Sequence, residues 1–398
     1  MMRGLIALLV GLSLGWGRET AFAWAREGHE VVALIAERLI SPETQAKVRQ
    51  LLARSGDKGL VSVACWADEV VLASRGEGPL SGDPETQELN TKFPKSRTWH
   101  FINLPLGTVS FEEASKFTSP DDIVHAIGRC IQVLESSEAD PLGLTKGQAL
   151  RLLVHLVGDI HQPLHCGTGF YKMIGPDAAQ LITYPEEAFG HPTDRGGNLL
   201  FYGTNPTDQL HALWDAVIVA KIDGTVGYEA LGNFLLQDDR HRQVTETPGD
   251  YHHWAESWAL ESVRIATLAY LGIAFENAAF DTNNNLVRIG IKLPIHYLET
   301  NQAYARLQLT KAGVRLAQLL DSIKWQNSAE PAAADAKHGG GQERVSRARQ
   351  TLQAASDRLR KEQRSANPAE MPPNPAHVVL PGQARQMKHD LLPAREKP

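Results

Sequence analysis

The sequence predicts an all-α protein built on a single, mostly helical domain. Two observations support this fold class: apolar residues recur at helical spacing in long segments, and no clear run of alternating apolar and polar residues predicts a strand. A region of roughly 300 residues can also bury one large core. We expect long helices at about residues 31–53, 120–136, 146–161, 210–221, 251–271 and 294–323.

Two short motifs mark helix starts within this pattern. Ser41-Pro42-Glu43 and Ser119-Pro120-Asp121 each combine an N-cap residue, a proline at the first helical position and an acid in the first turn. The motifs therefore predict helices that begin next to Ser41 and Ser119.

The first 23 residues have the layout of an export leader. Arg3 precedes an apolar run over residues 5–14, and Ala21-Phe22-Ala23 is a small-x-small cleavage site. The run is too short to span a bilayer. We expect residues 1–23 to be a signal peptide and the mature protein, beginning at Trp24, to be secreted or periplasmic.

The composition changes again after Trp325. Residues 326–398 are rich in Ala, Pro, Gln, Arg and Gly and have no aromatic residue to anchor a core, which predicts a low-complexity, disordered extension. From Asp335 onward this extension carries twelve Lys or Arg and seven Asp or Glu, a net charge of +5, which leaves −11 for the rest. The acidic remainder argues against tight binding to extended duplex nucleic acid. Residues 24–325 are the expected globular domain.

One apolar helical segment carries a histidine and an acid at the spacing of metal ligands. His155 and Asp159 are four residues apart, so on a helix they share a face. Pro163 ends the regular helix, which lets His165 turn toward a second ion. A histidine on an apolar face is often an ordinary core residue, but a buried carboxylate requires a cation or hydrogen-bond donors.

Further segments repeat this combination of residues. His211 and Asp215 are again four residues apart in an apolar helix, and Asp68 and His100 each follow a tryptophan in short motifs. The donors are imidazole nitrogen and carboxylate oxygen, with no thiolate set and no calcium-type oxygen cage, so zinc fits best.

Taken in order, these motifs resemble one known family. Trp24 with His29, Trp66-Ala67-Asp68, Trp99-His100-Phe101, His155 with Asp159 and His165, Gly196-Gly197-Asn198, and His211 with Asp215 are similar to the zinc-dependent single-strand-specific nucleases of the S-one and P-one type. The resemblance covers about residues 24–324 and implies their mostly helical fold. Zinc-dependent phospholipase C enzymes share the architecture, but they usually have Glu where this chain has Asp215.

The resemblance implies a site with three zinc ions. Asp68, His100, His155 and Asp159 would bind the first; the Trp24 amine and carbonyl, His29 and Asp159 the second; and His165, His211 and Asp215 the third. Asp159 would bridge the first two ions and, with Asp68, belong to the catalytic machinery.

The activity that the resemblance implies is hydrolysis of phosphodiesters in single-stranded DNA and RNA. A zinc-bridging hydroxide would attack phosphorus, leaving 5′-phosphorylated products, and 3′-nucleotides would also be substrates. A zinc-dependent phospholipase C is the alternative enzyme, and a non-catalytic metal- or nucleic-acid-binding protein is a third reading. We expect no membrane span; the sequence leaves the oligomeric state open, with a monomer favoured.

Substrate recognition is expected next to His100. Phe101 matches an aromatic residue on which the family stacks a base, although a residue of this type can also be ordinary core. Asn103 stands where the family usually has an acid, and its amide can donate as well as accept. About twenty residues are inserted between His165 and Gly196, and this insertion could reshape substrate access.

The remaining cysteines and histidines are expected outside the site. Cys65, Cys130 and Cys166 permit at most one disulfide, and Cys65 with Cys166 is one option that no spacing demands. We interpret five further histidines as structural or surface residues, namely His125, His161, His252, His253 and His296.

Overall fold

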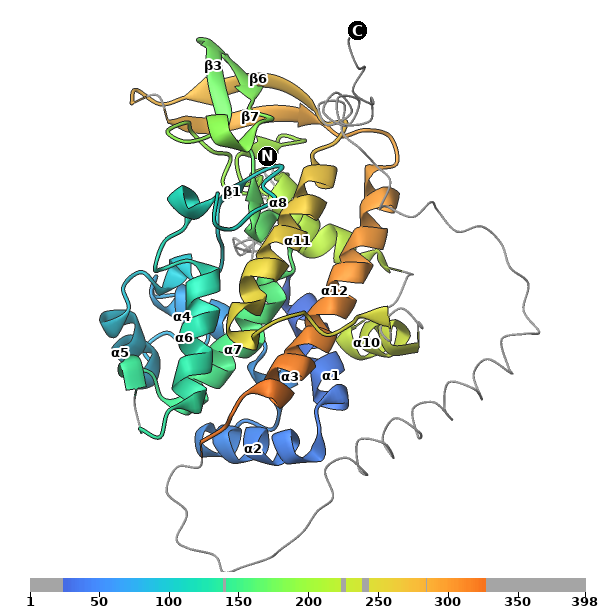
Figure 1. The fold of residues 1–398 in the computed structure, drawn as a ribbon. Helices are drawn as coiled ribbons and strands as arrows, with labels where there is room; N and C mark the ends of the chain where they lie inside the picture. Colours follow the sequence, from blue (N-terminus) through green and yellow to red (C-terminus); the bar gives the residue numbers. More distant parts are fainter. Residues whose placement is uncertain (1–23, 139–140, 223–226, 238–242, 284, 327–398) are drawn as a thin grey trace, which may run out of the picture. The chain divides into compact units, whose positions relative to one another are not determined.

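The computed structural model describes residues 24–138, 141–222, 227–237, 243–283 and 285–326. The predicted leader (1–23) and the predicted disordered extension (327–398) lie outside the described residues. The described chain forms a mostly helical domain, as the sequence predicts, with its strands gathered at one end and α2 at the opposite end (Figure 1). No described helix has the length and hydropathy needed to cross a membrane.

The helices account for most of the described residues. The principal ones are α1 (Arg26–Leu39), α2 (Pro42–Leu52), α3 (Leu60–Val63), α4 (Trp66–Ala73), α5 (Pro84–Lys92), α6 (Ile123–Glu135), α7 (Lys146–Ile160), α8 (Leu210–Ala212), α9 (Ile218–Ala220), α10 (Tyr228–Gln237), α11 (Trp254–Ala269) and α12 (Tyr297–Ser322). A π-helical turn, η7 (Leu213–Val217), joins α8 to α9. Short 3₁₀ turns include η2 (Ser96–Thr98), η3 (Ser115–Phe117), η5 (Pro163–His165) and η10 (Tyr251–His253).

Helix α7 is the centre of the core. Every one of its residues from Gln148 to Ile160 is buried, because α1, α4, α6, α11 and α12 all pack around it. Its first turn is fixed by a capping box, in which Thr145 and Gln148 each bond the other's backbone N–H. A histidine or aspartate on this helix is therefore held inside the domain.

Two helix boundaries differ from the prediction. The expected helix over 31–53 is divided, because Ser41 caps a new helix through its hydroxyl, which accepts from the Thr44 N–H. Helix α6 begins after Asp122, whose carboxylate accepts from the His125 N–H, and not next to Ser119. The proline and the two acids after Ser119 made several N-caps compatible with the same local sequence.

The mostly helical domain also contains short strands, which no alternating run in the sequence indicated. β6 (Ala274–Phe280) and β7 (Leu286–Lys292) form an antiparallel hairpin, which the short β5 (Leu200–Phe201) joins in parallel. β3 (Tyr171–Gly175) pairs with β4 (Ala178–Leu181), and β1 (Leu104–Pro105) with β2 (Gly167–Thr168). Register shifts within the β6–β7 pair interrupt the alternation of buried and exposed residues, so the sequence lacks the period of two.

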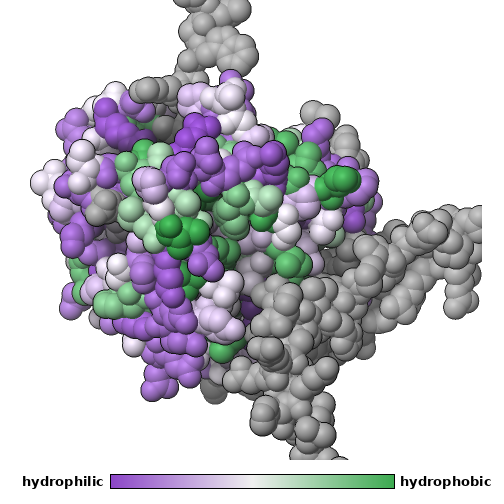
Figure 2. Space-filling view, turned by 90° about the horizontal axis from the view of Figure 1, so that it is seen from above, coloured by the Kyte–Doolittle hydropathy of each residue, from purple (hydrophilic) through white to green (hydrophobic). Residues whose placement is uncertain are grey.

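The strand-rich end carries exposed apolar side chains. Figure 2 views the molecule from this end and shows apolar residues near the middle of the face, with polar residues around them. Among the described strands, Met173 and Ile174 in β3 and Val287 in β7 are exposed. The β3–β4 hairpin lies in the insertion predicted between His165 and Gly196.

Candidate metal centre

The eight predicted His and Asp ligands are all buried and come from seven parts of the fold. His29 lies on α1, Asp68 on α4, His100 just after η2, and His155 and Asp159 on α7. His165, His211 and Asp215 lie on η5, α8 and η7. Their nitrogen and oxygen atoms form three groups in which the atoms lie within 4.8 Å of one another: His29, Asp68 and His155; His100, His155 and Asp159; and His165, His211 and Asp215.

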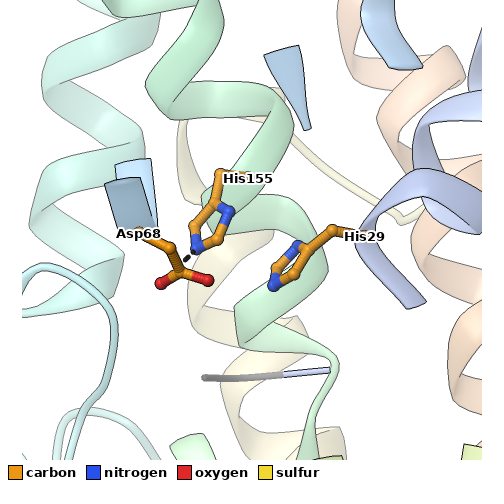
Figure 3. Close-up of side chains that lie close together, drawn as sticks. All are labelled: His29, Asp68 and His155. Carbon is orange, nitrogen blue, oxygen red and sulfur yellow. Dashed lines mark ion pairs between the residues drawn. The ribbon is translucent and has the colours of Figure 1, made fainter. Parts of the chain in front are cut away.

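Asp159 belongs to the second group and also contacts two histidines of the first. Its Oδ1 lies 3.2 Å from His29 Nε2, and its Oδ2 lies 2.9 Å from His100 Nδ1 and 3.2 Å from His155 Nε2. Asp68 Oδ1 lies 3.3 Å from His155 Nε2. Figure 3 shows Asp68 and His155 facing each other beside His29. The Asp159 carboxylate therefore contacts histidine ring nitrogens from three segments of the chain.

Close approach of α1 to α7 depends on a glycine. The rings of His29 and His155 are stacked with centroids 3.9 Å apart. A Cβ at Gly158 would lie only 2.7 Å from His29 Nδ1. A larger residue at 158 would push His29 out of the group.

The third group lies next to the C-terminal end of α7. His165 Nε2 lies 3.1 Å from His211 Nε2, which lies 3.5 Å from Asp215 Oδ2. The Gln162 amide donates to Asp215 Oδ1 at 2.6 Å. Sequence reasoning missed Gln162, although its place between Asp159 and His165 was a usable signal.

Backbone carbonyls orient three of the histidines. His155, His165 and His211 use Nδ1 to contact the carbonyl oxygens of Ala64, His100 and Gly196, at 2.7, 2.6 and 2.7 Å. Because a carbonyl can only accept, Nδ1 carries the proton and each Nε2 presents a lone pair to its group. This is how histidines that bind metals are usually held.

Several buried atoms of the centre have no hydrogen-bond partner among the described residues. They are both ring nitrogens of His29, Nε2 of His155, Oδ1 of Asp159 and Oδ2 of Asp215. In the described chain, no Lys or Arg forms an ion pair with Asp68, Asp159 or Asp215. Buried polar atoms and charges without partners are costly. The residues therefore fit divalent metal ions, which would satisfy these atoms and the charge together.

The acid–base balance of the centre agrees with this fit. Burial opposes protonation of His155, yet the carboxylates of Asp159 and Asp68 outweigh it and raise its pKa well above the ordinary value. Burial raises the pKa of Asp215 well above that of an ordinary aspartate. It lowers the pKa of His29 and His165, and that of His211 to about 3. A bound metal ion would compete with the protons whose binding these raised pKa values favour at His155 and Asp215.

Trp24 lies between the groups. Its buried indole donates from Nε1 to the carbonyl of Gly158 at 3.0 Å, and the next residue, Ala25, donates its N–H to the carbonyl of Asp215 at 2.9 Å. Trp24 is thus bonded to the residue before Asp159, and Ala25 is bonded to the backbone of Asp215. That its amine and carbonyl bind metal stays a prediction.

The predicted base-binding residues lie beside these groups. Phe101 is 36% exposed, which excludes ordinary core packing, and it follows His100 directly. Ile102 donates its N–H to the carbonyl of His165 at 2.8 Å, and Asn103 is half-buried. The segment 100–103 therefore connects the first groups to the third.

The residues expected outside the site are there. All three cysteines are free and buried, so the optional Cys65–Cys166 disulfide is not formed. His125, His252 and His253 contact nearby acids, and His296 precedes α12. His161 is buried, but its two ring nitrogens contact the Val157 carbonyl and Arg315.

A mostly helical domain with buried His and Asp groups of this kind is suited to metal-dependent hydrolysis of phosphate esters. A family model, described as S1/P1 nuclease, matches residues 24–324, and the chain belongs to this family. It is therefore an S1/P1-type nuclease, a phosphodiester hydrolase with nucleic acid substrates. The family domain begins at Trp24, where the sequence predicts cleavage.

Comparison with individual proteins agrees with the family. Endonuclease 4 of Arabidopsis thaliana is 30% identical over 323 residues, which cover 76% of this chain and 90% of that protein. Nuclease P1 of Penicillium citrinum is 28% identical over 321 residues, covering 75% and 97%. Nuclease S1 of Aspergillus oryzae (strain ATCC 42149 / RIB 40) is 28% identical over 319 residues, covering 78% and 95%.

Proposed function

We propose that this protein is a trinuclear-zinc nuclease that hydrolyses single-stranded DNA and RNA to 5′-phosphorylated products and also acts on 3′-nucleotides. The observation that carries the proposal is the set of buried His and Asp atoms that lack partners. Zinc suits a donor set of imidazole nitrogens and carboxylate oxygens.

The proposed ligands follow the three groups. Asp68, His100, His155 and Asp159 bind the first ion; Trp24 through its amine and carbonyl, His29 and Asp159 bind the second; and His165, His211 and Asp215 bind the third. The contacts of both Asp159 oxygens with different histidines support its bridging role. Bound zinc would supply a hydroxide nucleophile near neutral pH and neutralise charge on the phosphate.

The protein's own residues then position the substrate. Asp68 and Asp159 hold their histidines in the geometry described above. The partly exposed Phe101 offers a ring on which an unpaired base stacks, and such stacking tolerates any base. Asn103 can donate to or accept from the base edge. Bases within a duplex are already stacked, so single strands are favoured.

We also propose that residues 1–23 are a signal peptide, that residues 24–325 form the nuclease domain, and that the mature protein is secreted or periplasmic. The start of the family match at Trp24 supports this division. An amine at Trp24 is available as a ligand only after cleavage before that residue.

The test is metal analysis of the mature protein, with its amino-terminal residue sequenced, beside assays on single-stranded and duplex DNA. We expect about three zinc ions per chain, Trp24 first, and single strands cut at least roughly tenfold faster, with 5′-phosphate ends. His155→Gln should abolish activity, whereas His125→Gln, a change at a half-exposed histidine outside the centre, should not. A zinc-free active enzyme, or release of phosphocholine from lecithin without nucleotide products, would overturn the proposal.

A further inference from the structure

A buried aspartate outside the proposed ligand set lies behind the third group. Asp194 has no exposed surface, and no Lys or Arg among the described residues is paired with it. Its carboxylate instead accepts five hydrogen bonds, from the Thr168 hydroxyl, the N–H groups of Gly169 and Gly197, and the hydroxyls of Tyr171 and Tyr270. This number of donors explains how the carboxylate is tolerated inside the domain.

The three bonds to Oδ1 join the segment that follows His165 to the turn that contacts His211. Thr168 and Gly169 follow His165 along the chain, and they contact Oδ1 at 2.9 and 3.2 Å. The Gly197 N–H lies 3.0 Å from Oδ1, and Gly197 belongs to the turn whose Gly196 carbonyl contacts His211. One oxygen atom is thus bonded to both sides of the His165–His211 pair.

The turn contacts His211 directly. Gly196 accepts from His211 Nδ1 at 2.7 Å through its carbonyl and donates its own N–H to the Thr168 hydroxyl at 2.8 Å. That hydroxyl in turn donates to Asp194. A continuous path of hydrogen bonds therefore runs from Asp194 through Thr168 and Gly196 to the ring of His211.

The turn also lies very close to the backbone beside His165. Gly196 and Gly197 have φ of 61° and 82°, in the left-handed region that favours glycine. A Cβ at Gly196 would lie 2.1 Å from the carbonyl oxygen of Leu164. The position of the turn, and hence of its carbonyl, is narrowly determined.

The two bonds to Oδ2 are donated by tyrosine hydroxyls from other elements of the domain. Tyr171 is on β3 and Tyr270 follows α11, and their hydroxyls lie 2.7 and 2.9 Å from the oxygen. Neither tyrosine contacts a proposed ligand through its hydroxyl. These bonds satisfy Oδ2, while the three Oδ1 bonds connect the carboxylate to the segments beside the third group.

We propose that Asp194 is a positioning residue for the third metal ion, holding His165 and His211 at the separation and ring orientation that the ion requires. The inference rests on the third ion of the proposed function. Removing the carboxylate would free the Gly196 turn, so His211 Nδ1 would lose its fixed acceptor. Loss of such a partner typically weakens metal binding by about 10- to 100-fold.

The experiment measures zinc content and zinc affinity of the mature protein by chelator competition, with circular dichroism to follow folding. Asp194→Ala should keep two tight ions and bind the third about 10- to 100-fold more weakly, approaching the two-ion content of His211→Ala. Asp194→Asn should largely restore the third ion, because its amide oxygen can accept the three Oδ1 bonds and its NH₂ can donate to the tyrosine hydroxyls. Tyr270→Phe is the matched control: it removes a bond to the same carboxylate but should leave zinc affinity unchanged.

A folded Asp194→Ala protein that binds its third ion as tightly as the wild type would overturn the inference, and so would an equal loss in Tyr270→Phe, which would indicate general destabilisation. If Asp194→Ala does not fold, Thr168→Val tests the same path with a residue of similar shape. It should weaken the third ion by a few-fold, and an unchanged affinity would overturn the inference. Wild-type protein with only two ions would instead remove the third ion from the proposed function.

Discussion

Helix α7 and its end carry two buried histidines with opposite roles, His155 and His161. His155 Nε2 faces Asp68 and Asp159 and has no hydrogen-bond partner. His161, six residues later, bonds the Val157 carbonyl through Nδ1 and lies 3.1 Å from an Arg315 guanidinium nitrogen through Nε2. The two residues are equally buried, so burial alone does not reveal which one binds metal.

The surroundings of the two histidines differ in their source of positive charge. Around His161, Arg315 and Lys311 both pair with Glu261, at 2.8 and 2.9 Å. These cations and burial lower the pKa of His161 to about 3, so it stays neutral. Around His155, the carboxylates of Asp68 and Asp159 form no ion pair with a described Lys or Arg. The comparison teaches that buried carboxylates without a Lys or Arg partner indicate a metal site better than a buried histidine does.

The largest effect is expected from removing the bridging carboxylate. Asp159→Ala should lower kcat on single-stranded DNA by on the order of 10³-fold or more and reduce the zinc content, since both oxygens contact ligands. Glu261→Gln, at the other cluster, should leave activity within a few-fold of wild type. Equal losses in the two variants would remove the distinction between the clusters.

Removing the metal ions should lower the thermal stability of the domain. Stripping the ions with a chelator leaves the buried atoms of the centre without partners, so the midpoint of thermal unfolding should fall. One ion present at a thousandfold excess over its Kd contributes about 4 kcal/mol, or roughly 10 °C for a domain of this size. Scanning calorimetry before and after chelation, with zinc added back, measures the change. A midpoint that chelation does not move would contradict a metal-dependent centre.

The smallest effect concerns Glu261. Although burial raises it, the pKa of this carboxyl is held at about 2, against an ordinary value of 4.5, by Arg315 and Lys311. Because the folded-state pKa is depressed, the ion pairs stabilise the domain above pH 4.5, and the contribution is lost as the pH falls toward 2. Glu261→Gln should cost about 2 kcal/mol at pH 6 and clearly less at pH 3. Urea unfolding at the two pH values tests this; a cost that does not change with pH would exclude ionic stabilisation.

Local signals in the sequence predicted most of the helical framework and which His and Asp side chains lie close together. Spacing of four residues placed His155 with Asp159 on a buried face, and Pro163 ended α7 before His165. The π-helical turn around Asp215 was not predicted, yet the residue still meets His211. Side chains that share a helix face are fixed by local geometry, which a sequence contains.

What the sequence did not predict depends on contacts between distant segments. β5 joins β7 across almost ninety residues, and register shifts hide the alternation of β6 and β7. Asp194 and Gln162 were missed as supporting residues because their partners lie elsewhere in the chain or on another element. No local pattern separates a carboxylate that accepts five bonds from one exposed to solvent.

The buried thiols affect how the protein can be handled. Burial raises the pKa of Cys65 and Cys130 to about 12 and also raises that of Cys166, so almost no thiolate exists at neutral pH. Air oxidation and alkylating reagents act on the thiolate, so we expect these buried sulfurs to react slowly with both while the domain is folded. Purification buffers can therefore omit dithiothreitol, a dithiol that would compete with the protein for its metal.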